Sequence, residues 1–319
     1  MNHLNWSYKV EVLVRGKREK RVMSELTTPI HKGKSSVLVT GAEGQLGREL
    51  LEVLGSLGYE VHGLGHQELD ITDIEQCYHV LQRLKPGVVI HAAAYTNVDR
   101  AESEQDKAYE INAYGTRNIA AAAESIQAKL IYISTDYVFG GGAGQEPYDE
   151  FHPTHPINVY GQSKLQGEEF VRQLHSRFFI VRTSWVYGHH GSNFVKTMLN
   201  LASSQERISV VDDQIGCPTY TRDLALKLEE LASSQKYGTY HISGAGSCSW
   251  YELACSIMDL AGLKTAVIPV STREFPRPAP RPAYSVLMQK ALRLNGFSGL
   301  RDWREALAEY VNMEKTQRN

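Results

Sequence analysis

The chain contains one tyrosine and one lysine at a spacing that suits catalysis, Tyr160 and Lys164 in the segment 158–164. On a helix, side chains four positions apart lie on the same face and can act at one point. With 17 Tyr in 319 residues, chance alone gives roughly one such pair, so the spacing by itself is a weak signal. No other Tyr-x-x-x-Lys occurs in the sequence. What the pair means therefore depends on the elements around it.

A phenol beside an ammonium group suits proton transfer. The positive charge of Lys164 would lower the pKa of the Tyr160 phenol from its usual ~10, and an oxidised nicotinamide nearby would act in the same direction. We expect Thr135, in the strand end Ser134-Thr135-Asp136, to hydrogen-bond a substrate carbonyl while Tyr160 gives it a proton. Lys164 would also hold the ribose hydroxyls of a cofactor. Two helix residues that share a face by chance remain the alternative.

Three glycines follow the first predicted strand, in the order Gly-x-x-Gly-x-x-Gly. Glycine permits a tight turn and a close approach of the backbone to a phosphate, and the helix that follows offers free N–H groups to a pyrophosphate. A plain strand-to-helix turn is the alternative, but this spacing after a buried strand favours a dinucleotide site. The residues of this predicted site are Gly41, Gly44, Gln45, Leu46 and Gly47.

The identity of the dinucleotide depends on the end of the second predicted strand, residues 62–67, which carries no acid. An acid there would hold the ribose 2′-hydroxyl of NADH and repel the 2′-phosphate of NADPH. Its absence favours NADPH, and NADH stays possible because no arginine stands there either. Asp70, which precedes Ile71, either reaches the adenine amino group or is a turn-forming residue before a helix. The alanines at 92–94 either admit a ribose against the backbone or pack in a buried turn.

Strand-like and helix-like segments alternate over the first 187 residues. Short apolar, β-branched runs predict buried parallel strands, and apolar residues at helical spacing predict helices between them. The alternation predicts an α/β protein with a doubly wound, Rossmann-like parallel sheet. Right-handed crossovers would bring the glycine turn, Thr135 and Tyr160 to one edge of that sheet, where ligands bind. The predicted strands are 36–40, 60–64, 88–91, 130–134 and 178–182, and the predicted helices are 45–57, 73–84, 106–125 and the one that bears Tyr160.

The pattern becomes irregular after Tyr187. Helices are predicted at 193–202, 222–232 and 250–261, and the proline run 275–282 can form neither a helix nor an inner strand. We interpret this half as a smaller substrate-binding lobe over the ligand edge of the sheet. The predicted organisation is a flexible basic tail at 1–34, a cofactor-binding domain at 35–187 to which parts of 208–243 return, the lobe at 188–312 and a second tail at 313–319.

The composition is that of an ordinary globular protein, with 42% hydrophobic and 22% charged residues. A net charge of −2 gives no general attraction to nucleic acid or to an anionic membrane, and no apolar run approaches the ~20 residues of a membrane helix. The four cysteines form no Cys-x-x-Cys, which favours reduced thiols in the cytoplasm and no zinc site. Residues 1–34 hold eight Lys or Arg and three Glu, with no apolar core for a secretory signal. This composition predicts a loosely attached tail.

Several motifs and longer stretches of the sequence resemble those of a known protein family. The glycine motif, Asn112-x-x-Gly115-Thr116-x-Asn118 and Tyr160-x-x-x-Lys164 occur in the order found in the extended short-chain dehydrogenase/reductase superfamily. Within it, the chain from about 37 to 307 most resembles the dTDP-4-dehydrorhamnose reductase family. Two departures are Cys217, where that family usually has Ala, and the segment 62–67. The strings are AAAYTNVDRAE (92–102), STDYVFGG (134–141), PINVYGQSKLQGE (156–168), RTSWVYG (182–188), NFVKTML (193–199), DQIGCPT (213–219) and RPAYS (281–285).

The resemblance implies an enzyme that completes dTDP-L-rhamnose synthesis by reducing the 4-keto group of dTDP-4-dehydro-L-rhamnose with NAD(P)H, with Tyr160 as the proton donor. Some members of the family are described with Mg²⁺ held by glutamates at a dimer contact, but no glutamate cluster stands out in this sequence, so we predict no metal. The resemblance leaves a monomer and a homodimer open. Trp185 could also be an aromatic that ends a core strand, and Arg281, suited to a diphosphate, could be a solvated loop residue. The implied cofactor contacts are Gly44, Gln45, Leu46, Asp70, Ala94, Tyr95, Thr96, Tyr160 and Lys164, and the implied substrate contacts are Thr135, Asp136, Trp185, Asn193 and Arg281.

Three other functions compete with reduction. A sugar-nucleotide dehydratase of this superfamily would carry Glu after its Thr-Asp, and this chain has Tyr137 there. An epimerase is harder to exclude, although its fourth-strand pattern looks less like STDYVFGG. The regulatory subunit of methionine adenosyltransferase, a binding module, is also similar. The strings DQIGCPT and RTSWVYG favour the enzyme over that module.

Overall fold

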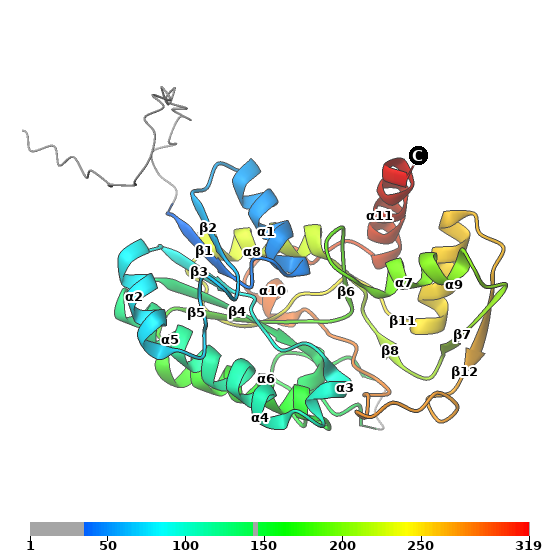
Figure 1. The fold of residues 1–319 in the computed structure, drawn as a ribbon, viewed down its shortest axis with the longest axis horizontal. Coiled ribbons are helices and arrows are strands. Elements are labelled where there is room, and N and C mark those ends of the chain that lie inside the picture. Colours follow the sequence, from blue (N-terminus) through cyan, green and yellow to red (C-terminus); the bar gives the residue numbers. More distant parts are fainter. Residues whose placement is uncertain (1–34, 143–145, 319) are drawn as a thin grey trace, which may run out of the picture. The chain divides into compact units, whose positions relative to one another are not determined.

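The structure is a computed structural model that describes residues 35–142 and 146–318. The predicted basic tail at 1–34 lies outside the described residues. The described residues belong to a single compact unit, and its elements are shown in Figure 1.

A parallel sheet of six strands organises the fold, in the order β10-β5-β4-β3-β1-β2. Every neighbouring pair is parallel, which confirms the predicted Rossmann-like α/β class. The sequence predicted five of these strands, and the sixth lies within the segment 208–243. The strands are β1 Val37–Thr40, β2 Val61–Leu64, β3 Val88–His91, β4 Lys129–Thr135, β5 Phe178–Thr183 and β10 Gly238–His241.

Helices cover both faces of the sheet, which is why its central strands are apolar throughout. Successive strand residues point to opposite faces: Val37 and Val39 join one core cluster and Leu38 joins another. The first cluster includes α1 Gln45–Ser56, α8 Thr221–Ser233 and α10 Lys290–Leu294. The second includes α2 Ile74–Leu84, α5 Thr116–Ser125 and α6 Val159–Leu174.

The predicted long helix at 106–125 is interrupted. The chain forms α3 Val98–Ala101 and α4 Gln105–Tyr109, then a π-helical turn at Glu110–Gly115 that runs directly into α5. π-turns are rare and frequently mark functional sites. Here the turn buries Asn112, whose side chain accepts from Tyr95 N at 2.8 Å and donates to Ser163 Oγ at 3.0 Å. These bonds tie the loop after β3 to the helix that bears Tyr160.

A smaller lobe follows β5. Its core gathers Tyr187, Leu253 and Trp303, all buried. Three short two-stranded sheets complete it, and residues 271–289 connect its last strand to α10 without any helix or longer strand. The helices are α7 Phe194–Ala202, α9 Trp250–Ala261 and α11 Trp303–Arg318, and the strand pairs are β6 Val186–Tyr187 with β9 Thr219–Tyr220, β7 Arg207–Val211 with β12 Ala266–Val270, and β8 Ile215–Gly216 with β11 Cys248–Ser249.

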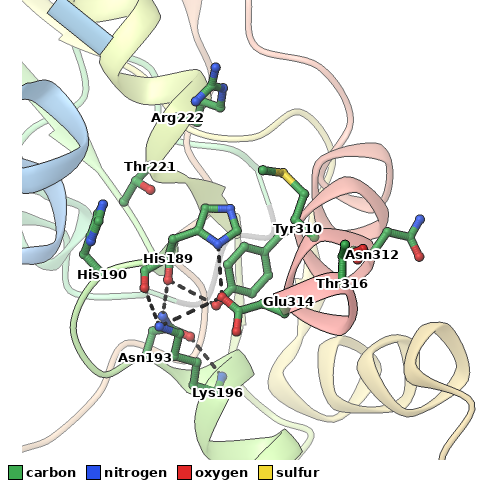
Figure 2. A network of polar contacts seen from close by, with 12 residues as sticks. His189, His190, Asn193, Lys196, Thr221, Arg222, Tyr310, Asn312, Glu314 and Thr316 are labelled. Atoms are coloured by element: carbon green, nitrogen blue, oxygen red, sulfur yellow. Dashed lines mark hydrogen bonds and ion pairs between the residues drawn. The ribbon is translucent and has the colours of Figure 1, made fainter. Parts of the chain in front are cut away.

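The C-terminal segment differs from the expected tail at 313–319. Helix α11 continues to Arg318, and Glu314 is only 7% exposed. Figure 2 shows the reason: His189 Nδ1 lies 3.0 Å from Glu314 Oε1, and Lys196 approaches the same carboxylate. Contacts of Glu314 with the lobe therefore hold this part of α11 against it. Among the helices of residues 35–142 and 146–318, none is long and apolar enough to cross a membrane.

Candidate active site

A cavity of about 1090 Å³ opens where the carboxyl ends of the parallel strands meet the lobe. This is the edge at which ligands bind in open α/β sheets. Fourteen of the predicted site residues line it: Gly41, Gly44, Gln45, Leu46, Gly47, Asp70, Ile71, Ala94, Thr96, Thr135, Asp136, Tyr160, Lys164 and Trp185.

The glycine turn leaves no room for side chains. Gly41 has φ of +66°, and a Cβ there would lie 2.7 Å from the Ala93 backbone. A Cβ on Gly47 would overlap the Gly41 carbonyl oxygen. Gly44 caps α1 without any side-chain hydrogen bond, so the first N–H groups of that twelve-residue helix stay available to an anion. The turn is thus shaped to receive a pyrophosphate against bare backbone.

The end of the cavity beside β2 carries more acid than the sequence of that strand suggests. A Cβ built on Gly65 would lie 2.8 Å from the Glu43 carboxylate and 2.9 Å from Glu68 Oε2. Glu43 comes from the glycine turn, and Glu68 accepts a hydrogen bond from Gly65 N at 2.9 Å. Two carboxylates therefore flank the end of β2, although the strand itself has none, so the missing acid of the strand does not by itself favour NADPH over NADH.

Asp70 forms a turn, as one of the two interpretations of it predicted. It lines the cavity, and its Oδ1 accepts from Thr72 N at 2.9 Å and from Thr72 Oγ1 at 2.8 Å. These bonds, the backbone one first, hold the pKa of Asp70 below its usual value. Asp70 is thus an ionised turn residue that also faces the cavity.

Tyr160 is the second residue of α6, and Asn158 caps that helix by accepting from Gly161 N at 2.7 Å. Burial raises the pKa of Tyr160 to about 12, although a hydrogen bond with Thr135 lowers it. The expected lowering by Lys164 is therefore wrong for the protein without ligands, because desolvation outweighs any effect of that charge. A raised pKa keeps the phenol protonated at neutral pH, as a proton donor requires.

Lys164 is only 2% exposed, one turn after Tyr160. Its Nζ donates to Ile133 O at 2.7 Å and lies 4.1 Å from the centre of the Tyr132 ring. Burial lowers the pKa of Lys164 to about 7, and the nearby Glu168 carboxylate opposes that shift. Glu168 is itself held ionised by Arg182, whose Nη2 donates to it at 2.7 Å.

Thr135 and Asp136 form the end of β4. Thr135 Oγ1 donates to Asp136 Oδ1 at 3.1 Å and accepts from Tyr137 N at 3.2 Å, which starts the short 3₁₀ helix Asp136–Val138. Asp136 also accepts from Ser285 Oγ at 2.6 Å. Burial nevertheless raises the pKa of Asp136 to about 6. The Thr135 hydroxyl is therefore already engaged on both sides.

Two tryptophans form one wall of the cavity. Trp185 stacks on Trp250 with ring centres 3.6 Å apart and planes 7° apart. Trp185 has φ of +48°, rare for a bulky residue, and a Cβ on Gly216 would overlap its ring. The backbone is thus bent to present the Trp185 ring, and Gly216 makes room for it.

Three predicted site residues do not line the cavity. The Tyr95 hydroxyl donates to Glu104 Oε2 at 2.8 Å. Asn193 caps α7 and donates to Gln45 Oε1 at 2.9 Å and to Gly188 O at 2.8 Å. Arg281 is paired with Asp99 and donates to Ala279 O at 2.7 Å.

Several lining residues were not among the site residues predicted from the sequence, among them Tyr137, Thr183 and Trp250. Tyr137 contacts the Tyr160 ring edge-on, with centres 5.9 Å apart. Tyr137 and Thr183 stand in strings that carried the resemblance, so their motifs offered a signal. Trp250 lies outside those strings and reaches the cavity only because α9 packs beside Trp185. Within the described ranges, no group of His, Cys, Asp or Glu side chains could hold a metal ion.

The parallel sheet, the glycine cradle and the Tyr160/Lys164 pair on one cavity define a dinucleotide-binding α/β protein of the extended short-chain dehydrogenase/reductase type. Residues 35–316 match the model of the RmlD substrate binding domain family. The chain belongs to this family.

Individual relatives are similar over nearly the whole described chain. The spore coat polysaccharide biosynthesis protein SpsK of Bacillus subtilis is 48% identical over 277 residues, which cover 87% of this chain and 97% of that protein. The dTDP-4-dehydrorhamnose reductase of Aggregatibacter actinomycetemcomitans is 41% identical, over 85% of this chain and 96% of its own length. A crystal structure of dTDP-4-dehydrorhamnose reductase from Bacillus anthracis, in complex with NADP, is 51% identical with a TM-score of 0.86, covering 88% and 100% of the two chains.

Proposed function

We propose that this protein is an NADPH-dependent reductase that converts dTDP-4-dehydro-L-rhamnose to dTDP-L-rhamnose. The observation that carries the proposal is the position of Tyr160, which lines the same cavity as the glycine cradle, Lys164 and Thr135. The relatives named as dTDP-4-dehydrorhamnose reductases, one of them solved with NADP, support it.

The cofactor would lie along the edge of the sheet. The backbone of Gly41, Gly44 and Gly47, with Gln45 and Leu46, would hold its pyrophosphate at the start of α1. Asp70 and Ile71 would contact the adenine, and Ala94, Tyr95 and Thr96 would border the ribose beside it. When bound, NADPH supplies the hydride for the reduction.

Tyr160 would give the proton that the reduced ketone oxygen takes up. Its phenol is neutral at pH 7 because burial keeps its pKa near 12, and donation becomes easier as negative charge develops on the substrate oxygen. Lys164, when protonated, would stabilise the phenolate left behind and hold the ribose hydroxyls. To do so, its Nζ must keep or exchange the bond to Ile133 O.

The sugar nucleotide would occupy the part of the cavity that the lobe covers. Thr135 and Asp136 would hydrogen-bond the sugar, and the Trp185 ring would pack against its apolar face. Arg281 would pair with the diphosphate, which requires it to leave or share Asp99. Asn193 would act by fixing Gln45 at the start of α1.

Two of the competing activities lack support from the site, and the assay separates the third, an epimerase. A dehydratase needs a carboxylate base where this chain has Tyr137, whose pKa burial raises far above neutrality. A purely regulatory module has no use for a buried Tyr160/Lys164 pair beside a glycine cradle. An epimerase of similar fold would carry out net isomerisation without net consumption of NADPH.

The decisive experiment follows NADPH oxidation at 340 nm with dTDP-4-dehydro-L-rhamnose, and identifies the product by mass. We expect one NADPH consumed per dTDP-L-rhamnose formed. A product formed without NADPH consumption would identify an epimerase, and NADPH binding without turnover would favour a regulatory module.

We also propose a cytoplasmic location and a monomer or homodimer with no nucleic-acid partner. Cys77, Cys217 and Cys248 are buried free thiols, which suits a reducing compartment. Size-exclusion chromatography with light scattering would determine the oligomeric state.

A further inference from the structure

Thr183, the last residue of β5, carries a hydroxyl for which the fold provides no partner. Its side chain is 6% exposed and lines the cavity. Its Oγ1 is among the few buried polar side-chain atoms in the described part of the chain that lack a hydrogen bond. Leaving a buried hydroxyl unsatisfied is unfavourable, so such groups call for an explanation, and a ligand is one.

The neighbours of Thr183 are all engaged elsewhere. Arg182 donates from Nε to Glu168 Oε1 at 2.9 Å, and Ser184 Oγ donates to Cys217 O at 2.7 Å. Thr183 is therefore the one hydroxyl of this strand end that remains free.

The register of the sheet places Thr183 next to the predicted reaction point. Thr183 on β5 is the direct partner of Thr135 on β4, and partners on parallel strands project from the same face about 4.8 Å apart. Thr135 already donates to Asp136 and accepts from Tyr137 N. Of the two hydroxyls, Thr183 is the one able to donate without giving up an existing bond.

We propose that the Thr183 hydroxyl is a ligand-binding group that donates a hydrogen bond to a carbonyl oxygen bound beside Tyr160. This inference rests on the proposed function, which brings two such oxygens to this end of the cavity: the ketone of the sugar and the carboxamide of the nicotinamide. A hydroxyl can donate to either, and the experiment separates them.

The test compares Thr183→Val, which replaces the hydroxyl with a methyl of the same shape, with Thr183→Ser, which keeps the hydroxyl. Ser243→Ala is the matched control, since Ser243 is a buried hydroxyl that does not line the cavity. NADPH affinity is measured by fluorescence, KM and kcat by NADPH oxidation with the dTDP-4-keto sugar, and stability by melting temperature. Thr183→Ala provides a second hydroxyl-free variant if the valine variant does not fold.

Thr183→Val should melt no lower than the wild type, because no protein hydrogen bond is lost. Its NADPH affinity, its sugar KM or its kcat should worsen roughly tenfold, the usual effect of losing one hydrogen bond. Thr183→Ser should stay within about threefold of the wild type in all three. Weaker NADPH binding would assign the bond to the carboxamide. A higher sugar KM or lower kcat with unchanged NADPH affinity would assign it to the sugar. Ser243→Ala should change neither.

Wild-type NADPH affinity, KM and kcat in a folded hydroxyl-free variant would overturn the inference. A wild-type protein that binds NADPH but leaves the dTDP sugar unreduced would refute the proposed function instead. In that case the NADPH measurement still tests whether Thr183 bonds the nicotinamide carboxamide. An unchanged NADPH affinity in Thr183→Val would reject that assignment too.

Discussion

Replacing Tyr160 by phenylalanine tests the proposed mechanism most directly, because it removes one hydroxyl and little else. The ring packs in a small cluster with Val159, Ala101 and Ala108 and against the edge of Tyr137. Phenylalanine preserves those contacts. The change removes the hydrogen bond with Thr135, worth about 0.5–1.5 kcal/mol.

The expected kinetic effect is much larger than that hydrogen bond. A positioned general acid contributes roughly 10²–10⁴ in rate, which corresponds to about 2.7–5.4 kcal/mol of activation free energy. Loss of one neutral hydrogen bond accounts for about tenfold at most. A fall in kcat of a hundredfold or more therefore identifies proton donation rather than ground-state binding.

The assay measures kcat of purified Tyr160→Phe with the dTDP-4-keto sugar, beside its NADPH affinity by fluorescence and its melting temperature. The glycine cradle and Lys164 are untouched, so folding and cofactor binding should persist. Near-normal kcat would show that another group supplies the proton and would refute the mechanism. Joint loss of activity and NADPH affinity would mean that Tyr160 mainly contacts the cofactor.

Three further outcomes are expected. Gly47→Ala should abolish NADPH binding, because its Cβ would overlap the Gly41 carbonyl oxygen, whereas Gly55→Ala in the same helix meets nothing within 4 Å and should bind normally; equal affinities would argue against the cradle. Arg281→Ala should raise the sugar-nucleotide KM roughly ten- to a hundredfold through loss of a charged hydrogen bond worth ~1.5–3 kcal/mol, while Arg277→Ala, on the exposed side of the same carboxylate, should not; an unchanged KM would remove Arg281 from the site. The pKa of Lys164 is about 7 in the folded protein, below its usual 10.5, so between these values only the unfolded chain holds the proton and stability should rise with pH. Urea unfolding from pH 7 to 10 should show that rise diminished in Lys164→Met, and parallel profiles for both proteins would contradict the burial of this amine.

The sequence by itself determined most of the sheet, the glycine turn and the placing of Tyr160 and Lys164 on one helix. Short apolar strands and helical periodicity are local signals, and five of the six strands of the sheet were located within one or two residues. The Tyr160/Lys164 spacing needed only a helix to place both side chains on one face. The same local reading of 106–125 as one helix missed the π-turn at Glu110–Gly115, because a single extra residue in a helix leaves the apolar pattern almost unchanged.

Only the tertiary structure decided the electrostatics and the free groups of the site. The pKa values of Tyr160 and Lys164 are set mainly by burial, which no sequence pattern shows. The carboxylates of Glu43 and Glu68 reach the end of β2 from other segments, so an acid absent from the strand was still present in space. Thr183 is free for the same kind of reason, since hydrogen-bond satisfaction depends on which atoms distant segments bring within reach. Spacing along a chain determines which residues share an element, and packing determines what surrounds them.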